Sequence, residues 1–373
     1  MACSKRSGDG MSRPASDVRW MERALFHAAR GAGRTSPNPL VGAVVVSPDG
    51  VLLGQGYHER AGEAHAEVVA LAAAGERARG ATLYCTLEPC AHQGRTGPCA
   101  ERIVAAGVVR VVASVEDPNP LVSGRGFAYL RAHGVDVEVG LGAARSCALN
   151  QPFFTLMREG RPFVILKAAT SADGFIAEAP DRPTPLTSTD ANRHAQRLRA
   201  AVDAIGIGVG TVIADDPALT ARGAYRERPL VRVVFDRSLR TPPSARLFST
   251  PDAGPVIIVT SQSAACRADL RRPLEARGAE VMAASGPMFR DALLLLGGRD
   301  IASLLLEGGA GIHCAAWDED VVDLVRLYVT PRVLGSGVPL LPGRTFSSSD
   351  LIDRHVEALG QDVLIEGYVH GPR

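Results

Sequence analysis

Apolar residues in the first part of the chain recur with two alternating spacings, one helical and one extended. From Asp17 to about Gly31 they follow helical spacing, and Ser16 is available as an N-cap. Two apolar runs then flank the turn Pro48-Asp49-Gly50, which predicts a β-hairpin. We expect strands at 41–47, 51–57, 81–87, 108–115 and 135–139, and helices at 17–31, 65–79, 99–106 and 124–133. This alternation predicts an α/β domain.

A domain boundary is expected where a hydrophobic patch, Pro152-Phe153-Phe154, is followed by Gly160 and Pro162. We divide the chain into a disordered leader at 1–16, a first domain at 17–159 and a second domain at 160–373. The second domain is predicted to contain strands at 163–167, 204–209, 231–235, 256–259, 280–283, 303–306, 325–330 and 362–368, and helices at 190–201, 265–277 and 288–296. Strands separated by helices predict a largely parallel sheet covered on both faces.

Composition narrows the class of protein. A length of 373 residues suits two domains, and a formal net charge of +1 lacks the basic excess of a nucleic-acid-binding protein. No apolar run reaches the roughly 18 residues that span a bilayer, and the leader lacks the apolar core of a signal peptide. The seven cysteines are odd in number and scattered, so we expect no disulfide framework and a cytoplasmic location.

Two segments, His65-Ala66-Glu67 and Pro89 to Cys99, contain the residues of a candidate catalytic zinc site. His65, Cys90 and Cys99 would supply one imidazole and two thiolates, which leaves the fourth tetrahedral position of Zn²⁺ open for a water of lowered pKa. Glu67 would move protons beside that water. Because Cys99 is expected to begin a helix, the partial positive charge there favours its thiolate.

A structural zinc site is the alternative. It would need a fourth protein ligand, for which His92 is available, but the acid at Glu67 would then have no purpose. We therefore favour a catalytic site. The other cysteines of the folded part, Cys85, Cys147, Cys266 and Cys314, are expected to be small buried residues.

The spacing of the zinc ligands points to a particular class of deaminase. Zinc deaminases share His-x-Glu followed by Pro-Cys-x-x-Cys, but here eight residues separate the two cysteines. The longer loop carries His92, Gln93, Arg95 and Thr96, donors that suit a polar or phosphorylated substrate. HAE, TLEPCAHQGRTGPC and EDPNP closely resemble the deaminase half of the bifunctional riboflavin-biosynthesis deaminase/reductase. The family usually has two prolines before the second cysteine, where this chain has Gly97-Pro98.

This resemblance implies roles for several residues of the first half. Asn38 and His58 would line the pyrimidine pocket. The donors of the longer loop, His92 and Arg95 among them, would contact the substrate.

The second half contains two glycine-rich turns that follow predicted strands. The segment from Gly206 to Thr211 lacks the G-x-G-x-x-G spacing and is equally compatible with an ordinary tight turn. The segment from Glu307 to Gly311 lies before a short helix, where an anion would meet free N–H groups. Two such turns in one α/β domain suggest a nucleotide cofactor.

The second half resembles the same bifunctional family in KAATSADG, GTVIADDPALTAR, RPLVRVVFDRSLRTPP, LEGGAGI and TPRVLG, so the resemblance covers about residues 17 to 345. It implies an α/β protein with an N-terminal cytidine-deaminase-like α/β/α domain and a dihydrofolate-reductase-like α/β domain that uses NADPH. By position, the cofactor would contact Ala169, Thr211, Asp215, Arg237, Gly309 and Gly311. The substrate would contact Lys167, Arg199, Leu219, Arg222 and Glu307, with the arginines on its phosphate.

Several of these residues have other interpretations. Asp215 could cap a turn, Arg199 could be a solvated helix residue, and Leu219 could belong to the core. Arg237 could neutralise the 2′-phosphate of NADPH, although the neighbouring Asp236 argues for NADH.

One loop departs from the family. Where relatives commonly have a serine and a tryptophan, this chain has Pro183, Thr184, Pro185 and Leu186. Two expected contacts are missing, which leaves open a reductase half that binds a metabolite or nucleotide without turnover.

The resemblance therefore predicts a cytoplasmic enzyme with two consecutive activities. The first is zinc-dependent deamination of 2,5-diamino-6-(5-phosphoribosylamino)pyrimidin-4-one, and the second is NADPH reduction of the ribosyl group of the resulting uracil to ribityl. We expect small-molecule pyrimidine substrates, no nucleic-acid or membrane partner, and a homo-oligomer, either a dimer or a tetramer. A deaminase of nucleic acids or free nucleosides would instead predict the short cysteine spacing or a basic groove, and the sequence has neither.

Overall fold

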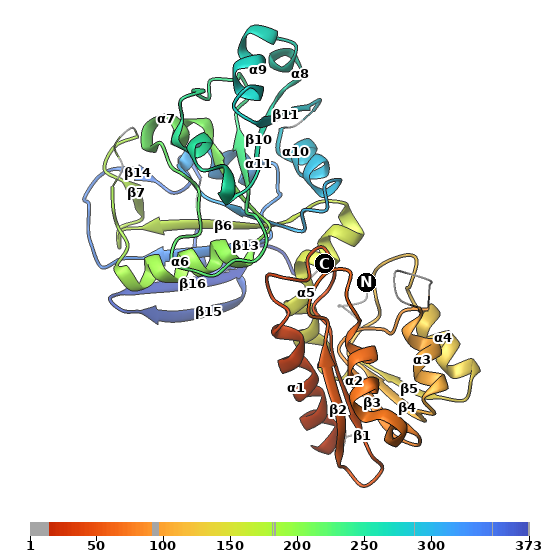
Figure 1. Ribbon diagram of the computed structural model, residues 1–373. Coiled ribbons are helices and arrows are strands. Elements are labelled where there is room, and N and C mark those ends of the chain that lie inside the picture. Colours follow the sequence, from red (N-terminus) through yellow and green to blue (C-terminus); the bar gives the residue numbers. More distant parts are fainter. Residues whose placement is uncertain are drawn as a thin grey trace. The chain divides into compact units, whose positions relative to one another are not determined.

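The chain divides into two compact units, and the boundary along the sequence lies between Glu159 and Gly160 (Figure 1). The computed structural model describes residues 15–91, 97–180, 182, 184–286, 288–344 and 346–371. None of the helices in these parts of the chain has the length and apolar character needed to cross a membrane.

The first unit contains a five-stranded sheet in the order β2-β1-β3-β4-β5. Strand β1 is antiparallel to both β2 and β3, and β3, β4 and β5 are parallel. The strands are β1 (Gly42–Val46), β2 (Leu52–Tyr57), β3 (Thr82–Cys85), β4 (Arg110–Ala113) and β5 (Asp136–Val139). The helices are α1 (Ala15–Ala29), α2 (Ala66–Ala74), the 3₁₀ helix η1 (Gly75–Ala78), α3 (Cys99–Ala105), α4 (Arg125–Ala132) and α5 (Ala143–Glu159).

Helices cover both faces of this sheet because β1 is apolar and buried along its whole length. Val44 and Val46 pack with residues of α1, whereas Ala43 and Val45 belong to a second cluster with residues of α2, α3 and α4. At Gly42 a Cβ would lie 2.0 Å from the Ala24 carbonyl oxygen, so glycine allows α1 to approach the sheet closely. The result is the three-layer α/β/α arrangement expected from the sequence.

Three local predictions for this unit were wrong. Helix α1 begins at Ala15, so Ser16 lies inside it and is not its N-cap. The helix predicted at 65–79 ends as an α-helix at Ala74, because Gly75 takes a φ of 58° and a 3₁₀ turn follows. Helix α5 was not predicted, because Pro152 lies inside it and proline normally interrupts a helix.

The second unit is built on a nine-stranded sheet in the order β11-β10-β9-β8-β12-β6-β13-β16-β15. Neighbouring strands from β11 to β13 are parallel, and β16 and β15 add an antiparallel edge. The strands are β6 (Phe163–Thr170), β8 (Ala204–Gly208), β9 (Val231–Phe235), β10 (Val256–Ser261), β11 (Ala279–Ala284), β12 (Ser303–Leu306), β13 (Leu324–Val329), β15 (Ile352–Leu359) and β16 (Asp362–Tyr368). A separate two-stranded sheet pairs β7 (Phe175–Ala177) with β14 (Val338–Pro339).

Helices pack on both faces of the large sheet, as its near-continuous apolar strands predicted. Leu304 and Leu306 of β12 belong to one core cluster, and Leu305 between them belongs to another. The helices are α6 (Thr189–Ala201), α7 (Val209–Asp215), α8 (Gln262–Ala265), α9 (Ala268–Glu275), α10 (Met288–Gly297) and α11 (Ala310–Asp318), with 3₁₀ turns η2 (Arg246–Ser249), η3 (Pro251–Ala253) and η4 (Ser348–Asp350).

Two further predictions for this unit were wrong. The helix predicted at 265–277 is two helices, α8 and α9, and it begins earlier than expected. Strand β15 was not predicted, because it is exposed at every position except Leu359 and therefore lacks the alternating apolar pattern of a half-buried strand.

Candidate active sites

His65, Cys90 and Cys99 lie together in the first unit, with their ligand atoms all within 4.8 Å of one another. The Nδ1 atom of His65 is 3.5 Å from the Cys90 sulfur and 3.3 Å from the Cys99 sulfur. His65 is the N-cap of α2, Cys90 follows β3, and Cys99 is the first residue of α3. Three separate element ends thus present their side chains to one point.

The donor set of this cluster fits Zn²⁺. It offers one imidazole nitrogen and two sulfurs, and three such ligands leave one tetrahedral position open. Cys90 and Cys99 are buried, and the interaction between their side chains lowers the pKa of Cys90 and raises the pKa of Cys99. The Cys99 backbone N–H also donates to the Cys90 sulfur, at 3.4 Å, which favours negative charge on it.

Glu67 lies beside the cluster in the first turn of α2 and is only 3% exposed. Burial raises the pKa of its carboxyl to about 7, and the other groups that act on this pKa include His65, Cys90 and Cys99. A carboxyl that exchanges its proton near neutral pH next to a metal-ligand cluster can act as a proton shuttle.

The structure brings Asn38 and His58 to the same place. The Asn38 side-chain amide lies 3.2 Å from Nε2 of His58, and Nδ1 of His58 lies 3.1 Å from the Ala64 carbonyl oxygen. The His58 and His65 rings are edge to face with centroids 5.6 Å apart. Burial lowers the pKa of His58, so its ring is neutral, and the Ala64 carbonyl favours the proton on Nδ1.

His92 and Arg95 lie outside the described residues, as do Gln93 and Thr96. Their predicted contacts with the substrate, and the alternative role of His92 as a fourth metal ligand, therefore stay predictions.

The expectation for the remaining cysteines was partly wrong. Cys85 is buried as predicted, but Cys266 is exposed and Cys314 is only partly buried. Cys147 is also buried, as predicted.

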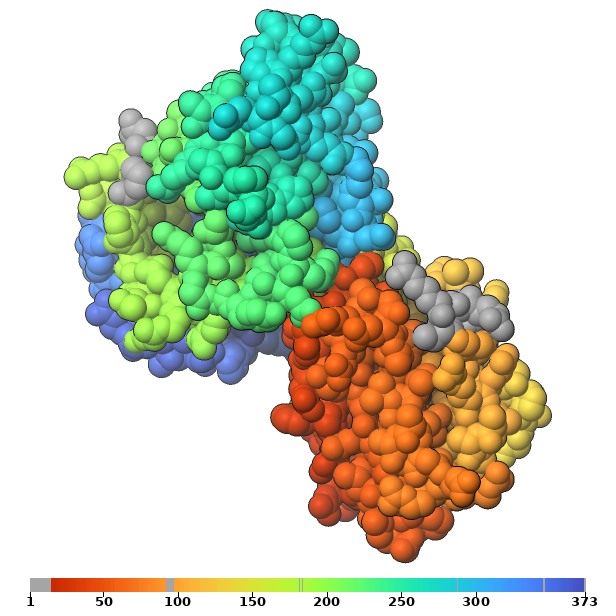
Figure 2. Space-filling model, in the orientation of Figure 1, coloured from red at the N-terminus to blue at the C-terminus, as the bar shows by residue number. Residues whose placement is uncertain are grey.

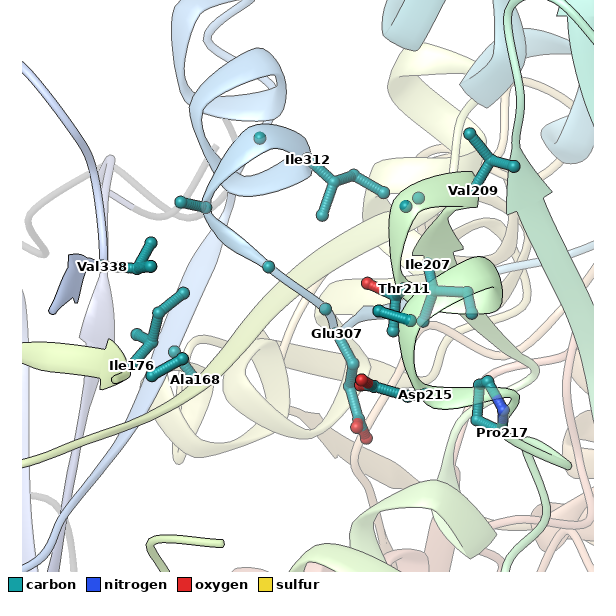
Figure 3. A pocket seen from close by; sticks show the side chains of 18 of the residues that line it. Ala168, Ile176, Ile207, Val209, Thr211, Asp215, Pro217, Glu307, Ile312 and Val338 are labelled. Atoms are coloured by element: carbon teal, nitrogen blue, oxygen red, sulfur yellow. The ribbon is translucent and has the colours of Figure 1, made fainter. Parts of the chain in front are cut away.

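The second unit contains a cavity of about 1030 Å³ at the carboxyl ends of β6, β8, β9 and β12. Parallel strands place these ends at one edge of a sheet, where ligands of α/β proteins usually bind. Many of its lining residues fall between Ile176 and Leu219, in the part of the chain that is yellow-green to green in Figure 2. Figure 3 shows Glu307 with Thr211 and Asp215 of α7 among the lining groups. The cavity is lined by ten residues that the resemblance selected, namely Lys167, Ala169, Arg199, Thr211, Asp215, Leu219, Arg237, Glu307, Gly309 and Gly311.

A largely buried ion pair between Arg199 and Glu307 forms part of the cavity wall. Nε and Nη2 of Arg199 each donate to a carboxylate oxygen of Glu307 at 2.8 Å, and Nη1 donates to the Thr220 carbonyl oxygen. Burial by itself would raise the pKa of Glu307, but the charges of Lys167 and Arg199 hold it at about 2. Arg199 is thus not the solvated helix residue of the alternative interpretation.

Of the other described residues predicted to contact the substrate, Lys167 and Leu219 line the cavity and Arg222 does not. The Lys167 ammonium lies 5.3 Å from the ring centroid of Tyr328. Leu219 is 4% exposed and belongs to a core cluster, so it both packs in the core and lines the cavity. Arg222 is exposed and is not among the described residues that line the cavity; its backbone N–H donates to the Gln196 side chain.

The cavity also has a region that fits a nucleotide cofactor. Gly309 is the N-cap of α11, and a Cβ added at Gly309 or Gly311 would meet only open space. Phosphate groups can approach such a bare helix start closely. Arg237 lines the cavity together with Ser238 and Arg240, two residues that sequence reasoning missed although they follow Arg237 closely in the same polar loop.

The position of Asp236 removes the argument for NADH. Its carboxylate is fully buried and accepts bonds from the backbone N–H groups of Ser238 and Thr241 and from the Thr241 hydroxyl, at 3.3, 2.7 and 2.7 Å. Its carboxylate therefore stabilises the loop through these hydrogen bonds, while the cationic side chains of Arg237 and Arg240 line the cavity.

The loop that departs from the family still forms part of the cavity wall. Thr184, Pro185 and Leu186 line it, whereas Pro183 lies outside the described residues.

Comparisons with known families match both units. Residues 14–115 match the cytidine and deoxycytidylate deaminase zinc-binding region, and residues 162–365 match the RibD C-terminal domain.

Similar proteins extend over nearly the whole chain. This chain is 39% identical to the riboflavin biosynthesis protein RibD of Aquifex aeolicus, in an alignment that covers 94% of this chain and 97% of the relative. It is 42% identical to RibD of Escherichia coli, in an alignment that covers 88% of this chain and 92% of that relative. Among solved structures, RibD of Acinetobacter baumannii has a TM-score of 0.83 at 36% identity, covering 95% of this chain and 98% of the other. A diaminohydroxyphosphoribosylaminopyrimidine deaminase/5-amino-6-(5-phosphoribosylamino)uracil reductase of Thermotoga maritima has a TM-score of 0.82 at 32% identity, with the same coverage.

Proposed function

Because this chain belongs to the RibD family of riboflavin biosynthesis proteins, we propose that its two units catalyse two consecutive steps of that pathway. The first unit deaminates 2,5-diamino-6-(5-phosphoribosylamino)pyrimidin-4-one by hydrolysis. The second unit uses NADPH to reduce the ribosyl group of the resulting uracil to ribityl. The observation that carries the first step is the buried cluster of His65, Cys90 and Cys99 with Glu67 beside it.

In the first unit, His65, Cys90 and Cys99 hold the metal and Glu67 moves the protons. Bound Zn²⁺ supplies a water whose lowered pKa makes it a nucleophile at neutral pH. Glu67 would take a proton from such a water and pass it to the amino group, which leaves as ammonia, and a pKa of about 7 suits both directions of transfer. Neutral His58 and the Asn38 amide orient the pyrimidine through hydrogen bonds, and His92 and Arg95 contact the rest of the substrate.

In the second unit, Lys167 and Glu307 orient the opened ribose, and Arg199 holds Glu307 in place. NADPH, when bound, supplies the hydride. Two N–H groups of the Arg199 guanidinium remain beyond its bonds to Glu307 and Thr220, and these can reach the substrate phosphate. Arg222 is a second phosphate contact, and Leu219 packs against the substrate.

The cofactor side of the second unit comprises a further set of residues. We assign to NADPH the residues Ala169, Thr211, Asp215, Arg237, Gly309 and Gly311. Open space at the two glycines and the cations of Arg237 and Arg240 support this assignment.

The location and assembly of the enzyme are part of the same proposal. We place it in the cytoplasm, because Cys90 and Cys99 must stay reduced to bind zinc. We expect a homo-oligomer, either a dimer or a tetramer, and neither nucleic acid nor a membrane as a partner.

A second unit without turnover is not supported by the comparisons. Relatives named as RibD align over 94% and 88% of this chain, and the family model of the C-terminal domain matches residues 162–365.

Replacing Glu67 tests the deaminase mechanism. In Glu67→Gln the isosteric amide cannot carry the proton, so we expect ammonia release to fall at least about 100-fold while one zinc per chain is retained. Ammonia release and metal content are measured on the same preparation. Glu63→Gln, which changes an exposed carboxylate four residues away, serves as the control and keeps wild-type activity. Retained activity in Glu67→Gln would remove Glu67 from its role.

The second activity is tested by NADPH oxidation with the deaminated intermediate as substrate. We expect turnover in the same preparation that releases ammonia. A protein with intact zinc and deaminase activity that oxidises no NADPH would refute the second step and leave the first.

A further inference from the structure

Glu88 lies two residues before the metal ligand Cys90 and is 3% exposed, yet the deamination mechanism does not use it. Its carboxylate accepts four backbone N–H groups. Oε2 accepts from Asp117 at 3.2 Å and from Gly124 at 2.9 Å, and Oε1 accepts from Gly126 at 2.9 Å and from Phe127 at 3.3 Å. Four donors to one buried carboxylate are enough to offset much of the cost of burying its charge.

These donors come from two segments that are far from Glu88 in the sequence. Asp117 lies in the loop after β4, and Gly124, Gly126 and Phe127 form the start of α4. The positive end of the α4 dipole therefore faces the Glu88 carboxylate. The contact is close as well as charged, because a Cβ at Gly126 would lie 1.9 Å from the Pro89 carbonyl oxygen.

Cys90 is fixed from its other side by α3. The backbone N–H of Cys99 donates to the Cys90 sulfur at 3.4 Å, and the N–H of Ala100 donates to the Cys90 carbonyl oxygen at 3.0 Å. The segment from Glu88 to Cys90 is thus held between the starts of two helices, by Glu88 at α4 and by Cys90 at α3.

We propose that Glu88 is a positioning residue that holds Cys90 in the geometry that zinc requires, although it neither binds the metal nor touches the substrate. Without its carboxylate, four buried N–H groups would lose their acceptor, and the start of α4 would no longer be fastened to the segment that carries Cys90. Part of the free energy of zinc binding would then be used to order the segment that carries Cys90, so the affinity for zinc would fall. This proposal rests on the zinc site of the proposed function but not on the identity of the substrate.

The test compares zinc affinity in the full-length chain for the wild type, Glu88→Gln, Glu88→Asp and Glu116→Gln. Zinc dissociation constants are measured by competition with a chromophoric chelator, and the d–d spectrum of the cobalt-substituted protein reports ligand geometry. Glutamine offers a single acceptor oxygen, and its amide would face N–H donors. We expect Glu88→Gln to bind zinc about 10- to 100-fold more weakly, as is typical for residues that orient metal ligands. Aspartate keeps the charge but is one methylene shorter, so we expect a smaller loss of more than about twofold.

Glu116→Gln is the matched control. Glu116 lies in the same loop as Asp117 but is exposed, and its carboxylate accepts from the Ser123 hydroxyl. It removes the same charge close to the site, and we expect a zinc affinity within about twofold of the wild type.

A purely structural role is distinguished by thermal unfolding of the metal-free proteins. If the Glu88 variants unfold at lower temperature but their folded molecules bind zinc with wild-type affinity and spectrum, the proposal is overturned. Should Glu88→Gln not fold, Glu88→Asp decides the matter by the same criterion. Because no substrate is used, a wild type that binds zinc tightly but releases no ammonia would refute the proposed function without touching this proposal.

Discussion

At the scale of single residues, His313 is a buried histidine whose environment neither unit's chemistry explains. It lies on α11 and is 0% exposed, and within the described parts of the chain neither ring nitrogen has a hydrogen-bond partner. Burial and, to a smaller extent, the charge of Lys167 lower the pKa of His313 to about 4, although the charge of Glu307 acts in the opposite direction. A histidine in such a place stays neutral in the folded protein over most of the physiological range.

This predicts a pH dependence of stability with a definite sign. Between pH 6.5 and about 4 the unfolded chain takes up a proton at His313 that the folded chain does not. The contribution is therefore fully present above pH 6.5 and is lost as the pH falls towards 4, by up to about 3 kcal/mol. Urea unfolding at pH 7 and pH 4.5 should show a smaller loss in His313→Asn than in the wild type. The exposed His355 provides the control, since His355→Asn should keep the wild-type difference, and an equal difference in all three would contradict the prediction.

At the scale of elements, the turn between β12 and α11 contains a position, Gly309, where a substitution should weaken cofactor binding without lowering the stability of the fold. Gly309 has an extended backbone, with φ −91° and ψ 176°, and a Cβ added to it would have no neighbouring atom within 4 Å, so a larger residue fits the fold. The side chain of that residue would instead occupy space that we assign to the cofactor phosphates.

Gly309→Val should therefore raise the KM for NADPH at least about tenfold and leave the thermal unfolding temperature and ammonia release unchanged. Steady-state NADPH oxidation measures the KM, and calorimetry measures the thermal unfolding temperature. Gly298→Val, at an exposed glycine after α10, should leave the KM for NADPH unchanged. An unaltered KM in Gly309→Val would place the cofactor elsewhere.

The elements also differ in how well the sequence predicts them. Strands such as β12, with four buried residues of which three are leucines, were found because their pattern is local. Helix α5 and strand β15 were missed because their local patterns disagree with their structure. Buried Phe153 and Phe154 anchor α5 in spite of Pro152, and pairing with β16 orders the exposed residues of β15.

At the scale of the whole molecule, each unit contains its own candidate site. The metal ligands all lie before Glu159, and the described residues that line the cavity lie between Lys167 and Val338. Removing zinc should therefore affect one activity and leave the other.

Treatment with a chelator should abolish ammonia release, while NADPH oxidation with the deaminated intermediate stays within about twofold of the untreated enzyme. Restoring zinc should recover ammonia release. Parallel loss of both activities would show that the second step depends on the metal. Light scattering of the same samples tests the predicted dimer or tetramer, which a monomer would contradict.

The sequence by itself determined the chemistry and the class of fold. His65, Glu67, Cys90 and Cys99 stand out because metal ligation needs particular side chains at the ends of elements, and the alternation of strands and helices follows from local periodicity. Only the tertiary structure decided which distant groups meet. It paired Arg199 with Glu307, which are 108 residues apart in the sequence. It directed the Asp236 carboxylate toward the backbone of the loop that follows it, and it placed Glu88 against the start of α4. These outcomes depend on burial, since a buried charge must find its partners wherever the fold brings them, and spacing along the chain does not record that.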